Sequence, residues 1–285
     1  MLMAQKSMYI ISRGIPAFML LVTFCAAANA EPVKPDTSVA TSVTLVSDYI
    51  WRGQSQTWGK PALQFSAEAV HSSGLYAGFF ASNVSSQWVP GAHLETDWYT
   101  GVRNPLTGSL SGLAYDLNIN YAYFSGGNFN KTGFNLPASS PDTVEISAAV
   151  NCRWLTVKTG RVLTKFYGWD TGNSSPGGFA GDPAAGVTGS TKGSYFMDAN
   201  ASYEISDGWS LNAQIGHQTI RNSHGLSWRY YKAGMSRTLD NWQVSLAGTA
   251  SSEPAAYKNF VGLVNNGATY SAARPAVVFS VARNL

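Results

Sequence analysis

Charged and amide side chains recur at every second position in several segments between residues 64 and 120. A spacing of two places side chains on one face of a β-strand. Such a face can line a hydrated passage, or it can fill a narrow barrel with internal hydrogen bonds, and the sequence leaves both open. The candidate lining residues are Glu68, His93, Glu95, Asp97, Arg103, Asp116, Asn118 and Asn120.

Three more polar residues, Asp48, Arg52 and Gln56, follow the first strand-like segment. Their side chains could fold into the mouth of a barrel, with Arg52 and Gln56 pairing with Asp48. The alternative is an arginine that ties the loop to the barrel wall, and loop residues near a rim more often pack than bind a ligand. We therefore treat these three as candidate mouth residues.

Two histidine–serine pairs raise the possibility of hydrolytic chemistry: His71 with Ser73, and His224 with Ser227. A catalytic serine needs a base that is held in place, and both pairs fall in expected turns or loops. The four histidines show no close metal-ligand spacing, and no Walker, Rossmann or zinc signature occurs. We therefore expect no enzyme activity, no metal and no cofactor.

The segment 113–123 shows the elements that would position these side chains. Its odd positions are large and apolar or aromatic, and its even positions are small or polar. About ten residues suffice for a tilted strand to cross a bilayer. We expect Tyr115, Leu117, Ile119, Tyr121 and Tyr123 to face lipid, with aromatic residues at the ends of the apolar stripe.

Strand-like segments repeat along the chain, and short and long connections alternate between them. This alternation is typical of the periplasmic turns and external loops of an outer-membrane barrel. It predicts an all-β, transmembrane, antiparallel up-and-down β-barrel with an even number of strands, about 12, and both termini periplasmic. The expected strands are 39–50, 62–71, 75–84, 93–103, 110–124, 143–151, 154–164, 194–204, 209–219, 226–238, 242–250 and 275–285.

Residues 1–30 have the pattern of a signal peptide, with Lys6 and Arg13 before an apolar run and Ala28-Asn29-Ala30 at its end. The barrel is then residues 31–285. Loss of the two basic leader residues lowers the formal charge from +3 to +1, which does not favour a nucleic-acid partner. Cys152 is the only cysteine after the leader, so an internal disulfide is excluded.

Short motifs in residues 45–103 resemble the proteobacterial family called TorF-like porins. They are Ser47-Asp48-Tyr49, Arg52-Gly53, Ser55-Gln56, Pro61-Ala62, Gly74-Leu75-Tyr76, Gly78, Ser82-Asn83-Val84, Glu95, Asp97, Tyr99 and Gly101. The resemblance implies an outer-membrane barrel with no catalytic residues. The final residue, Leu285, departs from the aromatic residue expected there.

From these patterns we expect a narrow channel in the bacterial outer membrane for passive diffusion of small hydrophilic solutes, weakly preferring cations. The alternative is a non-conducting barrel whose loops serve adhesion, receptor or structural roles. The loop 165–193 bears on this choice, because it is a constriction or plug if it enters the lumen and a binding surface if it projects outward. The expected partners are outer-membrane lipid, lipopolysaccharide, the solutes and the outer-membrane assembly machinery.

Overall fold

The computed structural model describes residues 36–177, 182–252, 254–258, 260–264 and 269–285. The expected leader, residues 1–30, and the expected start of the mature chain near Glu31 lie outside the described residues. So do Gly178 and Gly181 of the loop 165–193.

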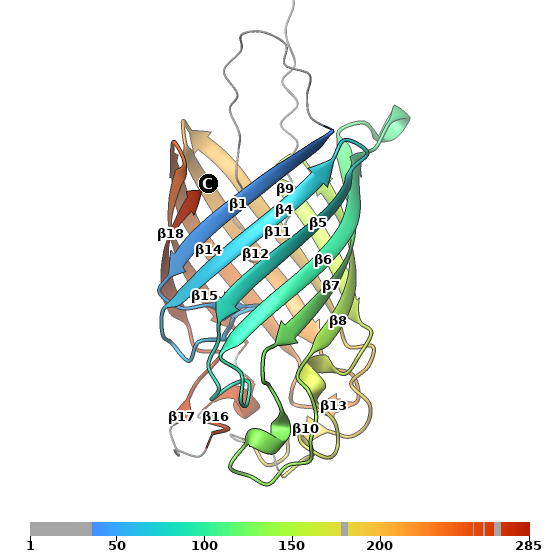
Figure 1. The fold of residues 1–285 in the computed structure, drawn as a ribbon, viewed down its shortest axis with the longest axis vertical. Helices are drawn as coiled ribbons and strands as arrows, with labels where there is room; N and C mark the ends of the chain where they lie inside the picture. The colour runs from blue at the N-terminus through green and yellow to red at the C-terminus, as the bar shows by residue number, and fades with distance from the viewer. Residues whose placement is uncertain (1–35, 178–181, 253, 259, 265–268) are drawn as a thin grey trace, which may run out of the picture.

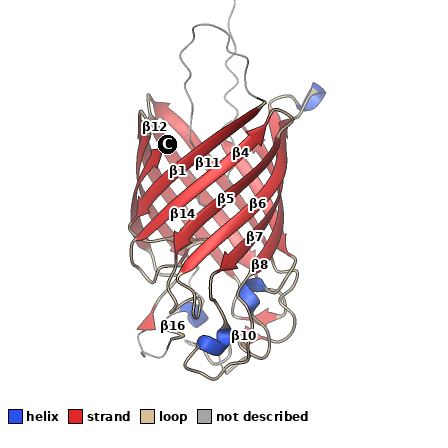
Figure 2. Cartoon of the chain, viewed as in Figure 1, coloured by secondary structure: helices blue, strands red, loops and turns tan. Residues whose placement is uncertain are grey.

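Twelve antiparallel strands form a closed barrel (Figures 1 and 2). Each strand pairs with its neighbour in the chain, and β1 also pairs with β18. Closure gives every strand a neighbour on both sides, as a lipid environment requires. The strands are β1 (Thr37–Val46), β4 (Ala62–His71), β5 (Leu75–Asn83), β6 (Leu94–Pro105), β7 (Leu113–Phe124), β8 (Thr143–Cys152), β9 (Leu155–Val162), β11 (Tyr195–Ser206), β12 (Trp209–Thr219), β14 (Trp228–Leu239), β15 (Trp242–Ser251) and β18 (Ala276–Asn284).

The predicted strand number and the predicted alternation of connections are confirmed. Five short turns join the strands at one end of the barrel, and six longer loops join them at the other (Figure 1). We call these the turn end and the loop end. β1 begins and β18 finishes at the turn end.

The first strand is shorter than predicted. It ends at Val46, whereas the sequence suggested residue 50. Residues 47–61 instead form the first loop, which contains the short hairpin of β2 (Ile50–Trp51) and β3 (Gln54–Ser55). Arg52 and Gly53 at its tip have φ angles of 46° and 78°, and this left-handed pair makes the tight turn that alternation alone did not reveal.

The two faces of the wall differ as the alternation predicted. On β7, Leu117 and Ile119 are 49% and 42% exposed, whereas Asp116, next to Leu117 on the same strand, points inward and is 6% exposed. Large apolar side chains cover the outside on every strand of the barrel. An apolar exterior around a polar interior is the inverse of a soluble barrel.

Among the described residues, a cluster of buried apolar side chains gathers at the loop end of the barrel. It joins Trp88, Phe166 and Tyr257 of three loops with Trp228 of β14 and other residues, and we call it the loop cap. Two more two-stranded sheets belong to the loops: β10 (Gly186–Val187) of one loop pairs with β13 (Ser223–His224) of another, and β16 (Phe260–Val261) pairs with β17 (Thr269–Tyr270).

Helical structure is limited to single 3₁₀ turns in the part of the chain that is described. They are η1 (Gly108–Leu110), η2 (Phe129–Lys131), η3 (Phe166–Gly168) and η4 (Ala255–Tyr257). None of the described helices has the length and apolar character needed to cross a bilayer.

Candidate functional site in the barrel lumen

The strand register places seven of the eight candidate lining residues on the inner face: Glu68, Glu95, Asp97, Arg103, Asp116, Asn118 and Asn120. His93 is the exception. It lies one residue before β6 begins, and its side chain is exposed. The strand was predicted to start at residue 93 but begins at Leu94, so His93 lies in the preceding loop and not in the barrel wall.

A network centred on Arg103 crosses four strands near the turn end. Arg103 Nη2 donates to Glu68 Oε2 at 2.7 Å, and Arg103 Nε lies 4.0 Å from Asp116 Oδ2. Its guanidinium carbon sits 3.8 Å from the ring centre of Tyr76. The Tyr76 hydroxyl donates to Asp116 Oδ1 at 2.6 Å and accepts from Asn118 Nδ2 at 3.0 Å.

Two glycines make room for the aromatic rings of this network. A Cβ on Gly101 would lie 2.5 Å from the Tyr76 hydroxyl oxygen, and one on Gly78 would lie 2.3 Å from the ring of Tyr99. Each tyrosine therefore lies flat over a glycine of the neighbouring strand instead of projecting across the lumen. The glycines set how far these side chains reach into the passage.

Polar side chains continue through the middle of the barrel. Asn120 Nδ2 donates to Asp97 Oδ2 at 3.2 Å, and across the lumen Asp198 accepts from Tyr230 at 2.9 Å and from Asn200 at 2.6 Å. Most of this layer keeps part of its surface accessible. The half-buried residues are Asp97, Asn118, Asn120, Lys158, Asn200, Asn212, Gln214 and Lys232.

Arg52 reaches from the first loop into the loop end of the lumen and is 4% exposed. Its guanidinium pairs with both carboxylate oxygens of Glu145, at 2.9 and 3.1 Å, and donates to Gln218 Oε1 at 2.6 Å. The same group stacks on Phe196, 3.5 Å from the ring centre. The Trp228 indole donates to the Arg52 carbonyl at 2.7 Å. Arg52 thus ties the first loop to the wall.

Asp48 is not the partner of Arg52, in contrast to the expected pairing. Asp48 Oδ1 accepts from the hydroxyls of Ser55 and Thr57, at 2.6 and 2.9 Å. Burial raises the pKa of this carboxyl, and the two hydroxyl donors oppose the rise. Gln56 is also buried, and its Nε2 donates to the Gln54 carbonyl at 3.2 Å. Both residues hold the first loop in shape.

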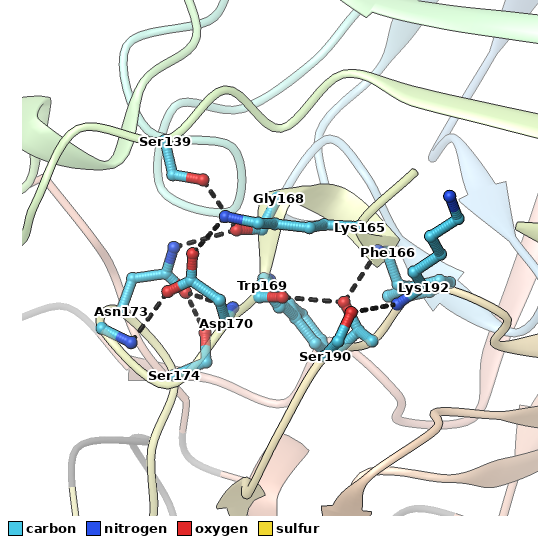
Figure 3. Close-up of polar contacts among 12 residues, drawn as sticks. Ser139, Lys165, Phe166, Gly168, Trp169, Asp170, Asn173, Ser174, Ser190 and Lys192 are labelled. Carbon is cyan, nitrogen blue, oxygen red and sulfur yellow. Dashed lines mark hydrogen bonds and ion pairs between the residues drawn. The ribbon is translucent and has the colours of Figure 1, made fainter. Parts of the chain in front are cut away.

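The loop 163–194 contributes to the loop cap rather than to the lumen wall. Phe166 and Trp169 belong to the buried cluster, and the loop extends beyond the strands (Figure 1). Its polar core is drawn in Figure 3, where Lys165 pairs with Asp170 and Asn173 Nδ2 donates to the Gly168 carbonyl at 2.9 Å. The lysine pair and the Gly172 amide outweigh burial and lower the pKa of Asp170.

The sequence did not reveal which side chains from distant segments pair with one another. Glu145 has the inward phase of its strand, but nothing local identifies Arg52, 93 residues earlier, as its partner. Lys232 was also missed, although it alternates with outward Tyr231 and Ala233. The alternation along this strand could have identified Lys232 as an inward-facing residue.

A family model described as "Bacterial protein of unknown function (Gcw_chp)" matches residues 29–284. The chain belongs to the Gcw_chp family. The match includes every strand of the barrel.

No curated protein matches this Gcw_chp chain. It is similar in shape to a KdgM porin in complex with disordered oligogalacturonate, at 7% identity and a TM-score of 0.46 over 87% of this chain and 98% of that one. It is also similar to the COG4313 outer membrane channel from Pseudomonas putida F1, at 10% identity and a TM-score of 0.41 over 90% and 100% of the two chains. Outer membrane phospholipase A from Escherichia coli gives 11% identity and a TM-score of 0.41 over 90% and 94%.

The histidine–serine pairs do not assemble a triad within the described part of this Gcw_chp barrel. His71 Nδ1 lies 2.8 Å from Ser73 Oγ in an exposed turn, but no described carboxylate orients the imidazole. Ser227 Oγ accepts from the Ile220 amide, and no hydrogen bond joins it to His224 among the described residues. The described residues also contain no cluster of three or more His, Cys, Asp or Glu that could hold a metal.

Proposed function

We propose that this Gcw_chp protein lies in the bacterial outer membrane and acts as a narrow, porin-like channel for passive diffusion of small hydrophilic solutes. The membrane location is supported by the closed strand order and the apolar exterior. A polypeptide can cross lipid only if its backbone groups are satisfied internally, and a closed barrel does this. The motifs in residues 45–103 that resemble TorF-like porins support the same location.

The observation that carries the channel proposal is the partial exposure of the polar layer in the middle of the barrel. Asn118, Lys158, Asn200 and Lys232 each keep accessible surface on the inner face, although one side-chain oxygen of Asp97 and one of Asn120 have none. Charged side chains in a dry interior would be fully packed against partners, because an unsolvated charge is costly. A hydrated interior accounts for this layer.

The inner charges support a modest preference for cations. Carboxylates outnumber basic groups among the described inward-facing residues and the first loop. The carboxylates are Asp48, Glu68, Glu95, Asp97, Asp116, Glu145, Asp198 and Glu204, and the basic groups are Arg52, Lys60, Arg103, Lys158 and Lys232. Fixed negative charge in a narrow passage concentrates cations, less so as salt shortens the screening length.

The loop end sets the expected size of the passage. Arg52 and the aromatic loop cap occupy the mouth, so we expect a small conductance and not that of a wide diffusion pore. The same packing favours a second candidate function: a non-conducting barrel whose loop cap presents a binding surface. Packed loops with their own apolar core are typical of a rigid recognition surface as well as of a constriction.

Single-channel recording of the refolded chain in a planar bilayer tests the proposal. We expect small, stable conductance steps and a cation-preferring reversal potential across a salt gradient. The Asp97→Asn, Asp116→Asn double variant should shift that potential toward anions. An anion-preferring parent, or no shift on neutralisation, would contradict the cation preference. Absence of conductance in correctly folded protein would favour the binding-surface function.

A further inference from the structure

A groove of about 760 Å³ crosses the outer, lipid-facing side of the barrel over β5 to β9 and β11. Its sides are large apolar side chains that point outward, among them Leu75, Leu117, Ile119, Ile146 and Tyr195. Its floor is formed where outward positions carry small residues: Thr100, Ala148 and Thr159. The groove therefore results from small outward-facing residues that lie between large outward-facing ones on these six strands.

The floor of the groove is apolar although it contains two threonines. Thr100 Oγ1 donates to the Tyr76 carbonyl and Thr159 Oγ1 donates to the Phe196 carbonyl, each at 2.8 Å. Because both hydroxyls donate to the barrel's own backbone, neither threonine brings an unpaired hydroxyl donor into the groove. The groove accordingly needs no water or polar partner and suits a hydrocarbon chain.

The groove runs from the turn end toward the loop end. Leu75 is the first residue of β5, directly after a short turn, and Tyr195 is the first residue of β11, directly after the loop 163–194. The register connects these points across the strands, since Ile119 pairs with Ile146, Ile146 with Arg161 and Arg161 with Tyr195. A hydrocarbon chain that lies in the groove would thus extend along the apolar outer face of the barrel and end at the loop end.

Three exposed basic residues, Arg161, Lys192 and Arg221, stand at the loop end of this groove, and we call them the rim cluster. The point where a Cβ of Gly193 would lie is 2.9 Å from Arg161 Nη2 and 3.2 Å from Arg221 Nη1, so the two guanidinium groups converge. Arg221 Nη1 also donates to the Lys192 carbonyl at 3.1 Å. Arg161 itself lines the groove.

The rim cluster has no acidic partner among the described residues: no ion pair to a carboxylate involves any of its three members. In Figure 3 the Lys192 side chain extends away from the polar contacts around Asp170, and its ammonium group carries no dashed line. Cations that converge without a counter-charge repel one another, and guanidinium groups bind phosphate oxygens especially well. An anion would supply the counter-charge that these three side chains lack among the described residues.

We propose that the groove and the rim cluster together bind one phosphorylated lipid of the outer leaflet. Its phosphate lies between Arg161, Lys192 and Arg221, and an acyl chain lies along the groove toward Leu75. The proposal rests on the membrane location in the proposed function, but not on conduction through the lumen. It gives the loop end of the barrel a fixed depth and orientation in the outer leaflet.

Native mass spectrometry of the full-length protein in a zwitterionic detergent tests this, with lipid A as the probe. We expect one bound lipid A per barrel. The Arg161→Gln, Arg221→Gln double variant should bind about tenfold more weakly or worse, because it loses charge-assisted hydrogen bonds to phosphate. Ala148→Trp, which fills the groove floor from the lipid side, should weaken binding independently, and dephosphorylated lipid A should bind weakly to the parent.

The matched control is Arg237→Gln, Arg283→Gln. These two arginines are exposed on the outside at the turn end, where each stacks on a tryptophan at 5.0 and 5.3 Å, so the control removes the same charge from the opposite rim. It should bind lipid A like the parent. Heat-modifiable mobility on gels checks that all variants are folded.

Several outcomes would overturn the proposal. They are equal binding by the rim variant and the parent, an equal loss in the control, equal binding of dephosphorylated lipid A, and displacement of lipid A by inorganic phosphate at the same concentration. A barrel dimer abolished by Ala148→Trp, in place of a lipid adduct, would assign the groove to a second copy. Since Arg161 and Arg221 face outward, conductance should not change in the rim variant, so a failed channel measurement leaves this test intact.

Discussion

At the scale of single residues, two arginines connect separate segments through contacts inside the lumen. Arg103 joins β4, β6 and β7 through Glu68 and Asp116. Arg52 joins the first loop to β8 and β12 through Glu145 and Gln218. The planar guanidinium allows both a two-pronged contact with a carboxylate and stacking on an aromatic ring, which lysine cannot reproduce.

Replacing Arg52 with Ala should both destabilise the protein and open its mouth. Glu145, whose side chain is 16% exposed, would lose its partner, and the loss of one member of a buried pair costs about 3–5 kcal/mol. We expect a lower urea midpoint for the protein folded in lipid vesicles, together with a larger single-channel conductance. Arg52→Lys keeps the charge without the fork and should recover only part of the stability. Unchanged stability and unchanged conductance in Arg52→Ala would contradict the role of this contact.

Asp170 should give the loop 163–194 a pH dependence below neutrality. Its pKa is lowered in the folded loop by Lys165 and the Gly172 amide, so the carboxylate stabilises the loop above the ordinary value of about 3.9. That stabilisation is lost as pH falls through the lower folded pKa. NMR titration of the Gly172 amide, which donates to Asp170 Oδ1 at 2.8 Å, should give a midpoint below 3.9. A midpoint above 3.9 would reverse the sign.

At the scale of elements, each strand of the barrel has an apolar outer face and a more polar inner face. On β7 the residues Leu117 and Ile119 contact the surroundings of the barrel, whereas Asn118 and Asn120 between and beside them face the lumen. A shift of one residue in the pairing would exchange the two faces. Because twelve strands share this register, the position of one strand fixes the positions of its neighbours.

An arginine should therefore be tolerated on one face of β7 and not on the other. Leu117→Arg or Ile119→Arg should cost about 2–4 kcal/mol near the middle of the bilayer. Asn120→Arg should cost much less, because Asn120 lies opposite Glu145 and hydrogen-bonds to Asp97, so the new cation meets carboxylates. Equilibrium unfolding in vesicles measures both. Equal costs on the two faces would contradict the register.

At the scale of the whole molecule, the wall and the loop cap are held together by different forces. The wall depends on backbone pairing between strands, whereas the loop cap has an apolar core of its own at one end. Trp88 of the loop between β5 and β6 contacts Tyr257 and Phe260 of the last loop, with ring centres 6.1 and 5.0 Å apart. The loop cap can thus loosen without opening the barrel.

Trp88→Ala tests this separation. Removal of a buried tryptophan should cost the loop cap about 3–5 kcal/mol of local stability. We expect faster tryptic cleavage after the exposed Lys258, with the heat-modifiable mobility of the folded barrel retained. Trp98→Ala on the lipid-facing side of β6 is the control, and it should leave cleavage at Lys258 unchanged. Loss of the folded barrel in Trp88→Ala would show that the loop cap and the wall are one cooperative unit.

The alternation of side chains by itself determined the strands, their number, the two ends of the barrel and the inward phase of Glu68, Asp97 and Arg103. These features follow from a local period of two and from local turn chemistry, so they are readable without the fold. The sequence also predicted two alternative roles for Arg52: pairing with Asp48 in the mouth, or tying the first loop to the barrel wall. It did not choose between them, because that choice depends on which strands face the first loop.

Only the tertiary structure decided the partners. Arg52 meets Glu145 and not Asp48, because barrel closure brings β8 and β12 to the first loop while the left-handed turn at Arg52 and Gly53 directs the arginine into the lumen. The loop cap, the groove and the rim cluster likewise combine residues from distant segments. Contacts of this kind are set by the closing of the sheet into a cylinder, and no local pattern in the chain records which residues that closure brings together.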